Sequence, residues 1–215
     1  MNDLTVVYYT SNQEQESFEK KVREKLLNVI GNLPLISVSH KPIDFGKNIC
    51  IGEQVPSNAI LYRQLLIGCQ AAETPFVINA EADFLYCPEY FSFLPSSPDK
   101  IYRYSNIRVM YKYHYGFFQK DYSEGAQIAG REYLISILKD YEKYTQVDES
   151  PHFRRLNPYR HLPFELYGDK NKACVTFKTG DSLHKYIKVG RQKSLPELPY
   201  WGTAENLRKE MFGTL

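Results

Sequence analysis

Two carboxylates stand two residues apart in residues 77–86, directly after an apolar run. They are Glu81 and Asp83, and apolar residues resume after them. In an extended chain, residues i and i+2 point to the same side. Two facing carboxylates repel each other unless a cation lies between them, and their hard oxygens suit Mg²⁺ or Mn²⁺. The spacing therefore predicts a divalent-metal site, the alternative being one turn-capping acid and one solvated acid.

The segments before these acids alternate between strand-like and helix-like patterns. Runs of β-branched and aromatic residues predict buried strands, whereas apolar residues at helical spacing predict helices. Strands are expected at residues 4–10, 35–39 and 75–80, and helices at residues 17–30 and 59–72. Such alternation is typical of an α/β fold in which a parallel sheet carries helices on its faces.

Ligands of parallel α/β sheets bind beyond the carboxyl ends of the strands. The segments that follow the three predicted strands are residues 10–12, 39–42 and 81–83. We expect these three segments to converge on one edge of the sheet, with Glu81 and Asp83 among them.

The second half of the chain has less regular patterns. Residues 101–118 suit one or two antiparallel strands, residues 128–141 a helix, and residues 173–178 a late strand. Residues 145–172 are charged and contain three prolines, which predicts a loop, and residues 196–215 indicate a Pro-rich turn and a short helix. Because nothing marks a linker, we expect one domain over residues 1–215.

Charge is distributed unevenly along the chain. The 215 residues carry a net charge of +2, but residues 1–100 sum to −4, residues 101–215 to +6, and residues 150–195 alone to +7. The basic part suits an anionic partner, such as the phosphates of a nucleotide or of a nucleic acid. The alternative is a solvated surface with uneven charge.

Composition also excludes several classes of protein. No apolar run approaches the ~18 residues of a membrane span, and the first residues lack the signals of a secretory leader. The four cysteines show neither CxxC spacing nor histidine partners at zinc-site distances. We therefore expect a cytoplasmic protein with reduced thiols.

Four segments resemble those of small glycosyltransferases of the GT-A fold, similar to glycosyltransferases of bacteria and bacteriophages. They are residues 6–10, 36–46, 62–68 and 81–86. The resemblance covers residues 3–95 well and the rest loosely. It implies a single GT-A (Rossmann-like) domain with a mostly parallel central sheet flanked by helices and an irregular basic C-terminal part. Residues 1–95 would bind the nucleotide sugar and residues 96–215 the acceptor.

The resemblance also implies a bound metal ion and a nucleotide-diphosphate sugar as the donor. The family usually has Glu-Asp-Asp or Asp-x-Asp at the third site, and this chain departs from that acidic triplet at Ala82. Asp83 would bind Mn²⁺ or Mg²⁺, and Glu81 would assist or contact the ribose. His184 would be a third metal ligand, because neutral imidazole suits Mn²⁺. The alternative for His184 is a surface position in a basic loop.

The other residues implied by the resemblance contact the nucleotide. Residues at the end of the first strand would meet the nucleobase or ribose, and the loop after the second strand would lie beside the nucleotide. Two residues of the second helix would contact the nucleotide or be solvated. Two late lysines would bind the diphosphate as point charges. In that order they are Tyr9, Thr10 and Ser11, then His40 and Lys41, then Arg63 and Gln64, and finally Lys185 and Lys188.

A catalytic base is required if the transfer inverts the sugar configuration, because a carboxylate must take the acceptor proton. Asp121 and Glu124 are the candidates, since they stand just before the helix predicted at residues 128–141. The alternative is that they are acidic residues capping that helix.

The function predicted is that of a metal-dependent glycosyltransferase acting on a hydroxyl acceptor. The acceptor is a glycan, a protein, or a modified base in DNA such as a hydroxymethyl-pyrimidine of phage DNA, which the basic segment and the many tyrosines would suit. The alternatives are a nucleotidyltransferase and a non-catalytic nucleotide-binding module. A nucleotidyltransferase usually has a Gly-rich basic loop after its first strand, and residues 10–14 contain neither Gly nor Lys.

Overall fold

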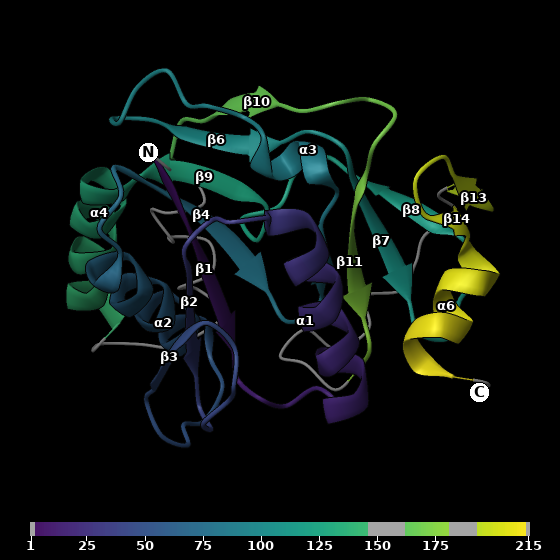
Figure 1. The fold of residues 1–215 in the computed structure, drawn as a ribbon, viewed down its shortest axis with the longest axis horizontal. Helices are drawn as coiled ribbons and strands as arrows, with labels where there is room; N and C mark the ends of the chain where they lie inside the picture. The colour runs from purple at the N-terminus through teal and green to yellow at the C-terminus, as the bar shows by residue number, and fades with distance from the viewer. Residues whose placement is uncertain (1–2, 146–161, 181–192, 214–215) are drawn as a thin grey trace.

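Strands and helices alternate through the first part of the chain. The computed structural model describes residues 3–145, 162–180 and 193–213, and Figure 1 traces them from the N-terminus. The expected order of three strands and two helices is confirmed, and β3 is a further short strand. These elements are β1 (Leu4–Thr10), α1 (Glu16–Ile30), β2 (Leu35–Ser39), β3 (Lys47–Cys50), α2 (Asn58–Ala71) and β4 (Phe76–Glu81).

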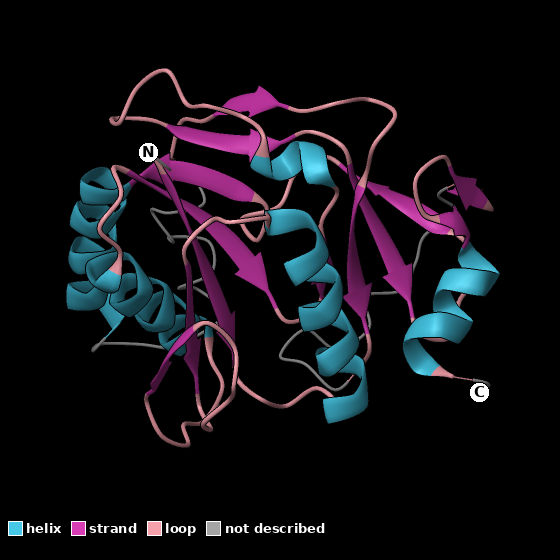
Figure 2. Ribbon diagram, viewed as in Figure 1, coloured by secondary structure: helices cyan, strands magenta, loops and turns pink. Residues whose placement is uncertain are grey.

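The later strands are short and form parts of two main sheets with helices around them (Figure 2). The late strand and the terminal helix are confirmed. The elements are β5 (Phe84–Leu85), α3 (Pro88–Phe91), β6 (Ile101–Tyr104), β7 (Ile107–Tyr111), β8 (Phe117–Lys120), β9 (Gln127–Gly130), α4 (Arg131–Thr145), β10 (Glu165–Tyr167), β11 (Cys174–Lys178), β12 (Ser194–Leu195), β13 (Glu197–Leu198), β14 (Gly202–Thr203) and α6 (Ala204–Phe212).

A seven-stranded sheet lies at the centre, with the strand order β10-β6-β9-β4-β1-β2-β3. β1 pairs in parallel with β2 and β4, and β2 pairs in parallel with β3, whereas β9 runs antiparallel to both of its neighbours. All residues of β1 are buried, as expected of a central strand covered on both faces. The predicted α/β fold with a mostly parallel sheet is therefore confirmed.

Helices cover both faces of this sheet (Figure 1). On one face, Leu26 of α1 shares a core with Tyr8 of β1. On the other face, Leu65 of α2 and Leu138 of α4 share a core with Val7. Because successive side chains of a strand point to opposite faces, β1 contributes to both cores.

A five-stranded sheet, with the order β12-β8-β7-β11-β5, lies beside the first. Helix α1 also packs here, since Phe18 shares a third core with Phe177 of β11 and Met211 of α6. β5 follows β4 after a two-residue turn and pairs antiparallel with β11. The backbone N–H of Phe177 donates to the carbonyl oxygen of Asp83 at 2.8 Å. The turn that contains Asp83 therefore joins the two sheets.

The helix predicted over residues 128–141 begins only at Arg131. Gln127–Gly130 form β9 instead, and Ile128 pairs with residues of both β4 and β6. A Cβ added to Gly130 would lie 1.6 Å from the carbonyl oxygen of Pro98, so this close backbone approach requires glycine. The periodicity of a short apolar run fits either a strand or a helix. Pairing with the two neighbouring strands makes this run a strand.

Two other expectations for the second half need correction. Residues 101–118 contribute to both sheets: β6 lies in the seven-stranded sheet, whereas β7 and β8 form an antiparallel pair in the five-stranded one. β10 lies within the predicted loop 145–172 and pairs with β6, while residues 146–161 are outside the described part. Three-residue strands leave almost no periodic signal, so only their pairing partner reveals them.

Two expectations from composition can be compared with the structure. Among residues 3–145, 162–180 and 193–213, no helix has the length and apolarity that a membrane crossing requires. All four cysteines are free thiols, and Cys69, Cys87 and Cys174 are buried.

Candidate active site

The carboxyl ends of β1, β2 and β4 lie next to one another, as the parallel sheet predicts. Tyr9 of β1 is the register partner of Glu81 at the end of β4, and Thr10 is the partner of Ser39 at the end of β2. The three segments that follow these strands therefore start from one edge of the sheet, where parallel α/β folds bind their ligands.

Glu81 is enclosed by neighbours at this edge. The hydroxyl of Tyr9 donates to Glu81 Oε1 at 2.9 Å, and the backbone N–H of Glu81 donates to the hydroxyl of Tyr86 at 2.9 Å. That hydroxyl in turn donates to the carbonyl oxygen of Gly125 at 2.6 Å. A Cβ on Gly125 would lie 2.2 Å from Glu81 Oε2, so a larger residue there would displace the carboxylate.

The ionisation of Glu81 is shifted strongly by this environment. Burial, followed by the charge of Asp83, raises the pKa of Glu81 to about 7. The Tyr9 hydrogen bond and the charges of Lys178 and Lys120 act in the opposite direction. Part of this carboxyl is therefore protonated near neutral pH, which is unusual for glutamate and frequent at functional sites.

Asp83 lies beside Glu81 but not for the reason that the sequence suggested. β4 ends at Glu81, and Ala82 and Asp83 form a turn, so the two acids do not share the face of one extended segment. Their proximity shows in the effect of the Asp83 charge on the pKa of Glu81. Asp83 Oδ2 also lies 3.5 Å from the ammonium nitrogen of Lys178, the last residue of β11.

Two lysines bring positive charge to these acids. Burial alone would lower the pKa of Lys178, but the charges of Asp83 and Glu81 outweigh it and hold the pKa above its usual value. Burial and the charge of Lys178 lower the pKa of Lys120, whose ammonium donates to Ser123 Oγ at 3.0 Å. Neither lysine was among the predicted site residues, although Lys178 ends a predicted strand and so carried a usable signal.

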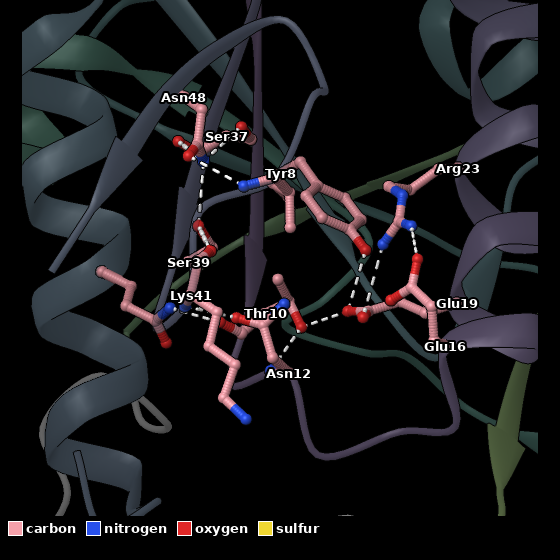
Figure 3. A network of polar contacts seen from close by, with 12 residues as sticks. Tyr8, Thr10, Asn12, Glu16, Glu19, Arg23, Ser37, Ser39, Lys41 and Asn48 are labelled. Carbon is pink, nitrogen blue, oxygen red and sulfur yellow. Dashed lines mark hydrogen bonds and ion pairs between the residues drawn. The ribbon is translucent and has the colours of Figure 1, made fainter. Parts of the chain in front are cut away.

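The loop after β1 is fixed by a buried carboxylate on α1 (Figure 3). The Thr10 hydroxyl donates to Glu19 Oε1 and accepts from the backbone N–H of Asn12 at 2.8 Å. Glu19 Oε1 also accepts from the hydroxyl of Tyr8 at 3.2 Å. Asn12 has a φ of 53°, a left-handed conformation that asparagine tolerates better than most residues. Thr10 is therefore a structural anchor of this turn.

The loop after β2 is held to the same edge, as Figure 3 shows. The Asn48 amide donates to Ser37 Oγ and Ser39 Oγ, both at 2.9 Å, and Ser39 Oγ donates to the carbonyl oxygen of Lys41 at 2.6 Å. The backbone N–H of Lys41 donates to Asn12 Oδ1 at 2.8 Å, which ties this loop to the loop after β1.

His40 and Lys41 differ in how far they reach solvent. His40 is buried and its Nε2 has no hydrogen-bond partner within the described chain, while burial lowers the pKa of the imidazole and keeps it neutral. The Lys41 side chain is exposed, and its ammonium lies 3.4 Å from Glu53 Oε1. Lys41 can therefore reach a ligand more readily than His40.

Gln64 and Arg63 are neighbours on α2 with different surroundings. Gln64 is buried, and its amide nitrogen donates to the carbonyl oxygens of Thr10 at 2.7 Å and Val38 at 3.0 Å. Gln64 thus braces the ends of β1 and β2. Arg63 is exposed, and Ser11 in the loop after β1 is partly exposed.

The two candidate bases lie between β8 and β9. Glu124 Oε2 accepts a hydrogen bond from the Tyr62 hydroxyl at 2.9 Å, and its charge acts on Lys120, whereas Asp121 is exposed. Neither acid caps a helix, because β9 separates them from α4. The alternative reading of these acids as helix caps is therefore wrong.

Several predicted ligands lie outside the described residues. They are His184, Lys185 and Lys188. Within the part of the chain that the structure describes, no group of three or more His, Cys, Asp and Glu residues could hold a metal ion.

The described charges do not fit a divalent ion between Glu81 and Asp83. Asp83 already lies 3.5 Å from the Lys178 ammonium, and Glu81 Oε1 accepts from Tyr9. A dication there would lie close to the Lys178 ammonium, and like charges repel each other. Metal binding by these acids stays a prediction.

Comparisons with known proteins identify structures of similar fold. No protein-family model matches the sequence, and no curated protein matches it by sequence. In solved structures, a glycosyltransferase involved in the glycosylation of the major capsid of PBCV-1 matches with a TM-score of 0.51 and 12% identity, over 97% of this chain and 98% of that chain. Residues 1–349 of TarS from S. aureus, in complex with UDP-GlcNAc, match with a TM-score of 0.50 and 12% identity, over 82% of this chain and 58% of that chain.

At 12% sequence identity, these two similarities concern the fold alone. The chain therefore has a GT-A-like fold, as the resemblance in sequence implied. The first match extends over nearly the whole of both chains.

Proposed function

We propose that the protein is a glycosyltransferase that moves a sugar from a nucleotide-diphosphate sugar to a hydroxyl acceptor. The observation that carries the proposal is a cluster of charged side chains at the end of β4. There Glu81 and Asp83 lie at the ligand-binding edge of a GT-A-like sheet, and Lys178 lies 3.5 Å from Asp83. Acidic and basic side chains at this edge suit a ligand that combines hydroxyl groups with phosphates.

The reaction breaks the bond between the anomeric carbon of the sugar and an oxygen of the diphosphate. The electron pair stays on that oxygen, and the acceptor oxygen forms the new bond to the anomeric carbon while losing its proton to a base. Negative charge therefore grows on the departing nucleoside diphosphate. Fixed positive groups that face this charge stabilise the transition state, and Lys178 is the described residue best placed for that task.

The donor nucleotide would lie against the loops after β1 and β2. Ser11 and Lys41 reach solvent and would contact the nucleotide, whereas Tyr9, Thr10 and His40 are buried and would lie behind these contacts. Hydrogen bonds among Thr10, Asn12, Lys41 and the neighbouring strands hold these loops in place before a ligand arrives. Such preorganisation reduces the entropy lost on binding.

Glu124 is the acceptor base that we propose for an inverting transfer. The charge of Glu124 acts on Lys120 and its carboxylate accepts a hydrogen bond from Tyr62, so Glu124 belongs to the same cluster of charged side chains as Glu81. Asp121, in contrast, is exposed. In this scheme residues 1–95 form most of the donor side, and residues 96–215 contribute the acceptor side together with Lys178. Free thiols and a nucleotide-sugar donor suit a cytoplasmic enzyme.

The acceptor that we propose is anionic, because residues 150–195 carry a net charge of +7. A hydroxymethyl-pyrimidine in DNA combines a hydroxyl group with a phosphate backbone, and inside a duplex it would have to be flipped out to reach the donor. Titrating the protein with DNA at several salt concentrations tests this choice. An affinity that falls steeply as salt rises supports a DNA acceptor, and an affinity independent of salt points to a neutral glycan or a protein.

Calorimetry with UDP, GDP, CDP and ADP, each with and without Mn²⁺, tests the proposed function. We expect one diphosphate to bind, and the matching nucleotide sugar to be slowly hydrolysed in the absence of acceptor. Asp83→Ala should abolish that hydrolysis, whereas Asp99→Ala, in an exposed loop, should not. A preference for triphosphates would favour a nucleotidyltransferase, and no binding of any nucleotide would overturn the proposal.

A further inference from the structure

Lys178 is held firmly where β11 meets the turn after β4. The residue before it, Phe177, donates its backbone N–H to the carbonyl oxygen of Asp83 at 2.8 Å, and the carbonyl oxygen of Lys178 accepts from the backbone N–H of Lys112 at 3.0 Å. The hydroxyl of the next residue, Thr179, donates to Glu14 Oε1 at 2.9 Å. The backbone on both sides of Lys178 is therefore fixed by neighbouring elements.

The Lys178 ammonium retains access to a ligand. Its side chain is 21% exposed and that of Asp83 is 15% exposed, so water reaches the pair at the surface of the site. An ammonium group has three N–H donors, and an interaction with one carboxylate leaves capacity for phosphate oxygens. Lysine binds phosphate as a compact point charge in many proteins.

Lys120 adds a second positive charge to the cluster that contains Glu81, Asp83 and Lys178. It comes from β8, and its ammonium donates to Ser123 Oγ. Lys120 is the register partner of Ile107 on β7 and Lys178 is the partner of Tyr111, so both lysines lie on the same face of the five-stranded sheet. The acids at the end of β4 are therefore accompanied by cations that belong to the chain itself.

We propose, on the basis of the proposed function, that Lys178 with Lys120 supplies the positive charge that holds the donor diphosphate, and that the nucleotide binds without a divalent ion. Asp83 then acts as a positioning residue, because it holds Lys178 rather than a metal. Ala82, which replaces an acid of the usual triplet, removes one oxygen ligand from the site and is consistent with this change.

The first experiment uses the unmodified protein. Binding of the diphosphate identified by the UDP, GDP, CDP and ADP series is measured by calorimetry in EDTA, and again with Mn²⁺ or Mg²⁺ in place of EDTA. We expect the affinity in EDTA to lie within about threefold of that with metal, a difference below 1 kcal/mol. Binding only with metal would overturn this inference and leave the proposed function standing. No binding in either buffer would overturn both.

Variants then locate the positive charge. In EDTA, Lys178→Met should weaken diphosphate binding about tenfold or more, because a charge-assisted contact is lost. Lys178→Arg should retain most of the affinity. Lys100→Met is the matched control, since Lys100 lies at the surface with its ammonium 2.6 Å from Glu165. An unchanged affinity of Lys178→Met in EDTA would overturn the assignment of that lysine.

Asp83→Asn separates a positioning role from a metal-ligand role. If Asp83 holds Lys178, the variant should bind the diphosphate more weakly in EDTA as well as in Mn²⁺. If Asp83 is a metal ligand, the loss should appear only in Mn²⁺, and that result would contradict the inference. Circular dichroism of each variant checks that the fold is intact, and the EDTA comparison on the unmodified protein needs no variant.

Discussion

The hydroxyl of Tyr9 donates a 2.9 Å hydrogen bond to Glu81 Oε1, and these two residues are register partners on β1 and β4. A cross-strand neighbour thus holds the carboxylate at the end of β4. The bond favours the ionised form of Glu81 and partly offsets burial and the charge of Asp83, which raise its pKa. Tyr9 therefore fixes the position of the Glu81 carboxylate and favours its ionised form.

Tyr9→Phe should raise the pKa of Glu81 above its value of about 7, because a donor to the ionised carboxylate is removed. A pH titration of the carboxyl carbon by NMR measures the shift. Tyr8→Phe is the matched control, since the hydroxyl of Tyr8 donates to Glu19 on α1 instead. A Glu81 pKa that is unchanged in Tyr9→Phe, or lowered, would contradict the prediction.

Gly125→Ala should damage the site with little loss of stability. The new Cβ would meet the far end of the Glu81 side chain, 2.2 Å from Oε2, and a flexible carboxylate can move aside. We expect the free energy of unfolding to change by less than about 1 kcal/mol while affinity for the nucleoside diphosphate falls. Urea denaturation and calorimetry measure the two effects.

Gly130→Ala makes the matched comparison, because its Cβ would lie 1.6 Å from a backbone oxygen, that of Pro98. A backbone atom moves aside less easily, so this variant should lose about 1–3 kcal/mol of stability. Equal losses of stability in Gly125→Ala and Gly130→Ala would show that Glu81 is not free to move.

Gln64→Leu should cost about 1–3 kcal/mol of stability, because two buried carbonyl oxygens, of Thr10 and Val38, lose their donor. Arg63→Leu, one residue earlier on the exposed side of α2, should change stability by less than about 0.5 kcal/mol. Denaturation by urea measures both variants. If they unfold at the same urea concentration, Gln64 does not brace the two strand ends.

Glu19→Gln should change how stability depends on pH. Burial raises the pKa of Glu19 above its ordinary value of 4.5, so between that value and the raised pKa the folded protein binds more protons than the unfolded chain. The free energy of unfolding of the unmodified protein should therefore rise, relative to the variant, as pH falls through this window. Urea denaturation at about pH 7 and about pH 5 checks the sign, and a relative fall in stability would contradict it.

The sequence determined the first half of the fold with few errors. Continuous apolar runs identify β1 and β4 because strands buried on both faces lack alternation. Helix α1 was visible because Phe18, Val22, Leu26 and Ile30 recur at helical spacing and form its buried face. Because the carboxyl ends of parallel strands lie at one edge of a sheet, the sequence also placed Glu81 and Thr10 at the same edge.

Local patterns were insufficient where short strands depend on distant partners. The run containing Ile128 fits either a strand or a helix, and only its pairing with β4 and β6 makes it β9. Lys178 ends a predicted strand, but nothing in its local sequence indicates that β11 pairs with β5. That pairing joins residues about ninety positions apart and brings Lys178 to Asp83.

The sequence by itself therefore determined which edge of the sheet carries the acids, because the pattern of nearby residues indicates the direction and the burial of each strand. Only the tertiary structure decided which cations accompany them. Charges interact through space rather than along the chain, and the ammonium of Lys178 approaches Asp83 only because two sheets meet at the turn after β4.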